Sequence, residues 1–157
     1  MLWKLMGSLL ILGTGALAAR YLTLYEKRRI RALEGWLDLI FYIRTRIDCF
    51  LTPIVEIFAT ADNALLLSCM GNGREHSPAE LLRHSRLYLG QDAARLLESF
   101  VGEIGCCYRE EQVKRCDYYI SALQSLRQKR AEALPARLRT KTALCICSAL
   151  ATVILLW

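Results

Sequence analysis

Two apolar runs, one at each end of the chain, constrain the fold more than any other feature. The first covers residues 5–19 and the second covers residues 142–157, and each is bordered by Lys and Arg on the side facing the middle of the sequence. The basic residues facing the middle are Arg20, Lys27, Arg28, Arg29 and Arg31 after the first run, and Arg137, Arg139 and Lys141 before the second, while Lys4 precedes the first run. Because basic residues beside membrane segments stay in the cytoplasm, the pattern predicts a helical hairpin with a cytoplasmic middle and both termini outside.

The lengths of the two runs set the predicted domain boundaries. A helix needs about 20 apolar residues to cross a hydrocarbon core of about 30 Å, and each uninterrupted run is shorter than that. Lys and Arg extend a span when their methylenes lie in hydrocarbon and their charges reach the headgroups. With this extension we predict transmembrane helices at residues 1–25 and 138–157, and a cytosolic helical domain at residues 26–137.

The first run also has features of a cleavable signal peptide, which leaves a secreted protein as an alternative. Its apolar length is suitable, and Ala-Leu-Ala at 16–18 resembles a cleavage site. The basic block that follows resists translocation, however. The seven cysteines are an odd number, and the adjacent Cys106 and Cys107 do not indicate a disulfide framework. We therefore favour reduced thiols in a cytosolic domain.

The middle of the chain has the period of amphipathic helices. Apolar residues recur three and four positions apart within 30–47, 93–104 and 113–126, and no convincing alternating strand pattern is present. The sequence therefore predicts an all-α fold. We expect a cytosolic bundle of about four to six helices, carried between the N-terminal and C-terminal transmembrane helices.

Capping residues predict several helix boundaries. Thr52 as N-cap and Pro53 at the first helical position predict a helix over about 53–63. Ser77 and Glu80 form a capping-box pattern at the start of another helix, and Gly105 suits a left-handed residue after a later one.

Further boundaries follow from glycine and proline. The Gly-Asn-Gly at 71–73 is a turn signal without the spacing of a phosphate loop. The helix that starts near Ser77 should reach about Tyr88 and end at Gly90. The last cytosolic helix should start near Arg109, and Pro135 should interrupt or kink the path into the second span.

Residues with catalytic or metal-binding chemistry are few. His76 and His84 are the only histidines, and we predict that both are exposed polar side chains. Cys106, Cys107 and Cys116 lack the spacing of a zinc site. We therefore expect no catalytic residues, no metal, no cofactor and no small-molecule substrate. The sequence predicts that the chain is not an enzyme.

The net charge has a simple explanation in membrane attraction. The formal charge is +6, and the basic residues cluster beside the two apolar runs. Attraction to anionic headgroups accounts for this arrangement, whereas no nucleic-acid-binding motif accompanies it. We expect the lipid bilayer as a partner and no nucleic acid.

Several short segments, in order along the chain, resemble the stage III sporulation protein AB family of endospore-forming bacteria. They include Arg-Ala-Leu at 31–33, Leu-Glu-Ser-Phe at 97–100 and a charged helix that runs into the C-terminal span. The resemblance covers essentially the whole chain. Its matching residues are Thr52, Pro53, Phe100, Gly105, Arg109, Glu110 and Gln112.

The resemblance implies a function that the residues alone do not show. Members of the family are similar, in their cytosolic helical domain, to general secretion pathway protein F, the platform protein of type II secretion. They belong to an assembly that links mother cell and forespore. The resemblance thus implies a non-enzymatic platform in the mother-cell membrane, with a cytosolic secretion-type ATPase, stage III sporulation protein AA, and other membrane components of the complex as partners.

A second function class remains open at this point. The chain is also consistent with a generic membrane-anchored helical regulator, or a lipid-sensing interaction domain, whose basic face binds anionic lipid. Such a regulator predicts lipid binding that collapses as salt screens the charges.

Overall fold

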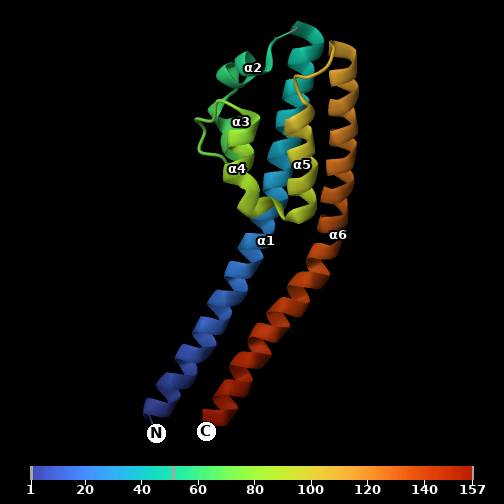
Figure 1. The fold of residues 1–157 in the computed structure, drawn as a ribbon. Helices are drawn as coiled ribbons and strands as arrows, with labels where there is room; N and C mark the ends of the chain where they lie inside the picture. Colours follow the sequence, from blue (N-terminus) through green and yellow to red (C-terminus); the bar gives the residue numbers. More distant parts are fainter. Residues whose placement is uncertain (1, 51, 157) are drawn as a thin grey trace. The chain divides into compact units, whose positions relative to one another are not determined.

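The computed structural model describes residues 2–50 and 52–156, so Met1, Leu51 and Trp157 lie outside the described residues. The described residues form helices and contain no strand, which confirms the all-α prediction. The helices are α1 Leu2–Phe50, α2 Ile54–Thr60, α3 Asn63–Ser68, α4 Pro78–Leu89, α5 Gln91–Glu103 and α6 Arg109–Leu156 (Figure 1).

The chain divides into two compact units. Unit 1 combines the two ends of the chain, Met1–Lys27 and Ala131–Trp157, and unit 2 is the continuous segment Arg28–Arg130. Helices α1 and α6 each contribute one part to unit 1 and one part to unit 2. The described helix α6 passes through Pro135 without ending, so of the two predicted outcomes, an interruption or a kink at this proline, the interruption is not observed.

Unit 2 is built around the apolar face of α1. Leu33, Trp36, Ile40 and Ile43 are fully buried, at the helical spacing that the sequence predicted. Against this face pack Leu81 and Leu89 of α4, Leu97 and Phe100 of α5, and Leu123 of α6. The result is one continuous hydrophobic core made by helices that are far apart in the sequence.

Polar contacts join the same helices. Arg44 of α1 donates to Asp117 of α6 at 2.6 Å, and Arg127 of α6 pairs with Glu34 of α1. The Phe100 ring of α5 meets the Tyr119 ring of α6 edge-on, with centroids 5.4 Å apart. These contacts fix α6 beside both α1 and α5 within unit 2.

The predicted helix over 53–63 is wrong in two respects. Thr52 is not the N-cap, because Pro53 takes that position with φ −61° and ψ 146°, and no side chain caps α2. The helix also stops at Thr60, because Asp62 accepts a hydrogen bond from the Ala64 N–H at 3.1 Å and so starts α3. The Asp62 side chain favours a new N-terminus over continuation of α2.

The boundaries predicted from Ser77 and the glycines are confirmed. Ser77 Oγ accepts from the Glu80 N–H at 3.3 Å, although Glu80 reaches back to the His76 N–H and not to Ser77. Gly90 at the end of α4 and Gly105 after α5 both have positive φ, 69° and 88°. The next helix, α6, starts at Arg109 as expected.

Unit 1 consists of the outer parts of α1 and α6, which run side by side in opposite directions, with both chain ends at one end of the pair (Figure 1). Lys141 Nζ lies 2.6 Å from Glu26 Oε1 and connects the two helices. Many large apolar side chains on this pair are exposed. They are Met6, Leu10, Leu17, Tyr21, Leu24, Leu144, Ile146, Leu150 and Ile154.

None of the described helices has an apolar stretch that is long enough to cross a bilayer. The predicted transmembrane helices at 1–25 and 138–157 are therefore not supported. Both predictions needed charged residues to extend short apolar runs. One of those residues, Lys141, instead forms an ion pair with Glu26.

Candidate docking groove

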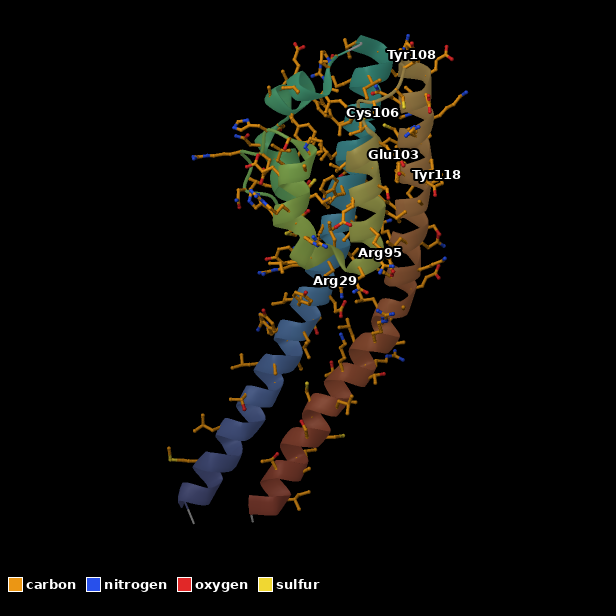
Figure 2. All side chains as sticks on the ribbon, in the orientation of Figure 1. Arg29, Arg95, Glu103, Cys106, Tyr108 and Tyr118 are labelled. Carbon is orange, nitrogen blue, oxygen red and sulfur yellow. The ribbon has the colours of Figure 1, made fainter. Side chains whose placement is uncertain are left out.

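An apolar groove of about 630 Å³ opens at one end of unit 2. Five segments of the chain meet there: the end of α1, the connection into α2, the start of α4, the end of α5 and the start of α6. The lining residues are Ile47, Thr52, Pro53, Ile54, Val55, Pro78, Ala79, Val101, Ile104, Gly105, Cys106, Arg109 and Gln112. Cys106 and Tyr108 lie at this end of unit 2, and Arg29 lies at the other end (Figure 2).

The turn between α5 and α6 needs a glycine for two reasons. Gly105 has φ 88°, a conformation that side chains other than glycine rarely adopt. A Cβ at this position would also lie 3.1 Å from Cδ1 of Ile54, a lining residue at the start of α2. Gly105 therefore lets the wall from α5 approach the wall from α2 closely.

The side chain of Arg109 links the start of α6 to the end of α1 by hydrogen bonds. Its Nη2 donates to the backbone oxygen of Asp48 at 2.5 Å and to Asp48 Oδ1 at 3.0 Å. An arginine near a helix C-terminus stabilises the last carbonyls, which lack partners within the helix. Gln112 Nε2 donates to the Cys107 oxygen at 2.5 Å and holds the preceding turn against α6. These two side chains keep three walls of the groove in place.

Five of the seven residues that carry the sequence resemblance line this groove: Thr52, Pro53, Gly105, Arg109 and Gln112. They come from segments more than 50 positions apart, and the fold brings them together. The remaining two do not line it. Phe100 is buried in the core behind it with 1% exposed area, and Glu110 is exposed on α6.

The predicted membrane-flanking basic residues divide between the two units. Arg20, Lys27, Arg137 and Arg139 are exposed in unit 1, whereas Lys141 is partly buried beside Glu26. The side chain of Lys4 lies outside those described.

Arg28, Arg29 and Arg31 belong to unit 2. Arg28 and Arg31 are exposed, but Arg29 is partly buried against Gly90, at the junction of α4 and α5. Arg130 donates to the Leu89 oxygen of the same junction at 2.8 Å. Some of the basic residues thus help to pack unit 2, a role that the sequence pattern alone did not show.

A second, polar pocket of about 440 Å³ surrounds Glu75. The Glu75 side chain is 1% exposed, and its oxygens accept hydrogen bonds from the N–H groups of Asn72 and Arg74, the latter at 3.2 Å. His84 Nδ1 lies 3.0 Å from Glu75 Oε1. Burial alone would raise the pKa of Glu75, but the hydrogen bonds from Asn72 and His84 outweigh it, and the pKa is lowered.

This pocket shows what sequence reasoning missed. His84 was predicted to be exposed, but its side chain is 32% exposed and contacts Glu75, whereas His76 is exposed as predicted. Glu75 lies in a turn-rich segment, where a glutamate is ordinarily solvated, so no sequence signal distinguished it.

The cysteines are free thiols in different environments. Cys69 and Cys116 are buried, and burial raises the pKa of Cys69 to about 12 and that of Cys116 to about 11. Cys49 and Cys106 are exposed. Across 2–50 and 52–156, no group of three or more His, Cys, Asp or Glu side chains is placed to hold a metal ion.

Comparison with known proteins gives one match. The family model described as stage III sporulation protein AB matches residues 75–157, which is more than half of the 157-residue chain. The matched range contains the groove residues contributed by α4, α5 and α6. No curated protein and no solved structure matches the chain. On the strength of the family match, the chain belongs to the stage III sporulation protein AB family.

Proposed function

We propose that this sporulation-related protein is a non-enzymatic platform subunit of a type II secretion-like complex linking mother cell and forespore. In this proposal, unit 2 docks a cytosolic secretion-type ATPase, stage III sporulation protein AA. Unit 1 attaches the protein to the mother-cell membrane beside the other membrane components of the complex.

The observation that supports docking is the groove at the end of unit 2. Five residues of the family resemblance line it, and its walls come from five segments of the fold. A large apolar concavity on a protein surface is typical of a binding site. Because most of the lining residues are aliphatic, the groove suits contact with another polypeptide better than acid-base chemistry.

The observation that supports membrane attachment is the surface of unit 1. Large apolar side chains are exposed along both of its helices, and Arg20, Lys27, Arg137 and Arg139 are exposed beside them. Apolar side chains favour the acyl region of a bilayer, and cations favour anionic headgroups. We propose that unit 2 remains on the cytoplasmic side of the membrane and that both termini lie outside.

The similarity to general secretion pathway protein F is part of this proposal. A platform protein of that kind receives an ATPase on its cytosolic domain and transmits the conformational change to membrane partners. Within unit 2 the hydrophobic core joins α1 to α6, and both helices continue in sequence into unit 1.

Binding of the ATPase tests the proposal. The full-length protein, reconstituted in nanodiscs of zwitterionic lipid, is immobilised and exposed to purified stage III sporulation protein AA, with and without nucleotide. We expect retention above empty nanodiscs in at least one nucleotide state. Absence of retention in every state contradicts the platform role.

The sidedness is tested separately with thiol chemistry. A membrane-impermeant maleimide added to whole cells should leave the exposed Cys49 and Cys106 unmodified, and the same reagent should modify both after permeabilisation. Modification in intact cells contradicts a cytoplasmic unit 2 and favours the export alternative.

Exposed basic residues favour a second candidate function, a lipid-sensing regulator. Besides those of unit 1, Arg28 and Arg31 are exposed on α1. This function predicts that the protein binds vesicles containing anionic lipid much more strongly than zwitterionic vesicles. It also predicts that binding weakens steeply as salt rises, because added ions screen exposed charges. Equal binding to both vesicle types eliminates it.

A further inference from the structure

The docking groove lies in the acidic part of a basic chain. The whole chain has a net charge of +6, yet residues 47–73 and 96–108 contain no Lys or Arg. These two segments supply most of the groove walls. Their charged residues are Asp48, Glu56, Asp62, Glu98 and Glu103.

Most of these carboxylates already have partners within the described residues. Asp48 pairs with Arg109, Glu98 pairs with Arg86 at 3.2 Å, and Glu103 pairs with Arg115 at 3.0 Å. The one cation in the lining, Arg109, is therefore neutralised by Asp48 and adds little net positive charge to the groove.

Two exposed carboxylates beside the groove have no ion-pair partner among the described residues. Glu56 follows the lining residue Val55 in the first turn of α2, and Glu110 follows the lining residue Arg109 in the first turn of α6. Each of them is the sequence neighbour of a lining residue. Each therefore adds a negative charge close to the lining that no described ion pair neutralises.

The apolar part of the groove is also accessible. Val55 is 77% exposed, and the exposed Ala79 lies on the wall formed by α4. Ile54 and Ile104 are only partly buried against the core. These side chains lose contact with water when an apolar segment covers them, which contributes roughly 25 cal/mol per Å² of buried apolar area.

From this charge pattern we infer that the groove binds an amphipathic segment of the cytosolic partner, whose apolar side chains fill the groove and whose Lys or Arg side chains meet Glu56 and Glu110. The inference rests on the proposed function and specifies the chemistry of its partner. Opposite charges across an interface increase the association rate and exclude like-charged competitors. The same two carboxylates disfavour an acidic segment and an anionic headgroup by like-charge repulsion.

The test measures binding of two matched peptides to the full-length protein in zwitterionic nanodiscs. Both fluorescent peptides form the same Leu-faced helix, and they differ only in carrying Lys or Glu on the flanks. Fluorescence anisotropy gives the dissociation constants. We expect the Lys peptide to bind at least about tenfold more tightly than the Glu peptide, and its affinity to fall as salt rises.

Three variants locate the binding. The double variant Glu56→Lys, Glu110→Lys should bind the Glu peptide more tightly than the Lys peptide. The variant Ala79→Trp, at an exposed lining position, should lower the affinity for both peptides because the indole fills the groove. The control Asp38→Lys makes one such carboxylate-to-ammonium change at an exposed α1 position outside the lining and should leave the preference unchanged. Equal affinities for the two peptides, or equal effects of Asp38→Lys and the double variant, overturn the inference.

The same variants separate this inference from the proposed function. If the ATPase binds the wild type and all the variants equally, the ATPase docks elsewhere and the inference about its segment is wrong, while the platform role stands. If the ATPase does not bind, but the peptides discriminate as expected, the groove chemistry stands and the ATPase partnership fails. A third outcome is that neither peptide binds, that the wild type self-associates and that the Ala79→Trp variant does not. In that case the groove binds a second copy of this chain, and the inference is wrong.

Discussion

The indole Nε1 of Trp36 donates a hydrogen bond to Oγ of Ser85 at 3.1 Å inside the core of unit 2. Both residues are 0% exposed, and Trp36 is among the largest fully buried side chains. Ser85 Oγ in turn donates to the Leu82 oxygen at 3.3 Å. This polar contact within an apolar core fixes the rotation of α4 against α1.

Replacing the acceptor, Ser85, should therefore lower the free energy of unfolding. Ser85→Ala leaves the buried Trp36 N–H without a partner, and we expect a loss of about 1–3 kcal/mol in the free energy of unfolding. Urea unfolding followed by circular dichroism measures this. In a double-mutant cycle, Ser85→Ala should cost much less when Trp36 is already Phe. If Ser85→Ala lowers the free energy of unfolding equally in the wild type and in the Trp36→Phe background, the assigned hydrogen bond is contradicted.

Glu75 should make stability depend on pH. Its pKa is lowered by folding, so the ionised form stabilises the native state fully above the ordinary value of 4.5. That contribution is lost as the pH falls below 4.5 and through the lower native value. In Glu75→Gln the free energy of unfolding should be lower than that of the wild type at pH 7, and the difference should shrink towards pH 3. Unfolding series at several pH values measure the difference, with the exposed Glu110→Gln as the matched control. A difference that stays constant with pH contradicts this role of Glu75.

Gly35 should tolerate no side chain, although it lies inside a helix. A Cβ there would meet the backbone of Ser68 and would lie 2.7 Å from the Cys69 nitrogen, so α3 would have to move. We expect Gly35→Ala to destabilise unit 2 by about 1–3 kcal/mol, because overpacking exceeds the gain in helix propensity. Gly102→Ala in α5 is the matched control, because nothing lies within 4 Å of its added Cβ, and it should stabilise slightly. Equal melting temperatures for the two variants refute the close approach of α3 to α1.

The thiols should react in two groups. Cys69 and Cys116 are buried, and burial raises the pKa of Cys69 to about 12, so little thiolate is present at pH 8. We expect iodoacetamide to modify Cys49 and Cys106 at least about 100-fold faster than the buried pair. Mass spectrometry of peptides from the native protein measures the rates, and unfolding in urea should equalise them. Rapid modification of Cys69 in the native protein contradicts the packing of α3.

Local rules predicted the boundaries whose causes are local. Ser77 and Gly105 were identified correctly because a side-chain cap and a left-handed glycine depend on a few neighbouring residues. The helix over 53–63 was wrong because Asp62 competes for the next N-terminus. The sequence is compatible with one helix over 53–63 and with a new helix that starts at Asp62, and only packing decides between them.

The groove and the Glu75 pocket could not be predicted in the same way. Thr52 and Gln112 were expected to carry the family resemblance in separate stretches of sequence, and nothing local indicated that they line one groove. The contact of His84 with Glu75 depends on how the turn before α4 folds back onto that helix. Both sites arise from tertiary contacts that hydrophobic periodicity does not encode.

The membrane prediction depended on the extension of short apolar runs by charged residues. Within the described residues Lys141 pairs with Glu26, and no helix meets the requirement for crossing a bilayer. The exposed apolar side chains of unit 1 are the observation on which the proposal of membrane attachment rests.

Site-specific photo-crosslinking in sporulating cells tests the central claim, that the groove docks the ATPase, most directly. Benzoylphenylalanine replaces Val55, which is 77% exposed and lines the groove, or, as the control, Asp38, which is exposed outside it. The account predicts an ultraviolet-dependent adduct with stage III sporulation protein AA from position 55 and little or none from position 38. No ATPase adduct from position 55, or equal yields from both positions, would contradict it.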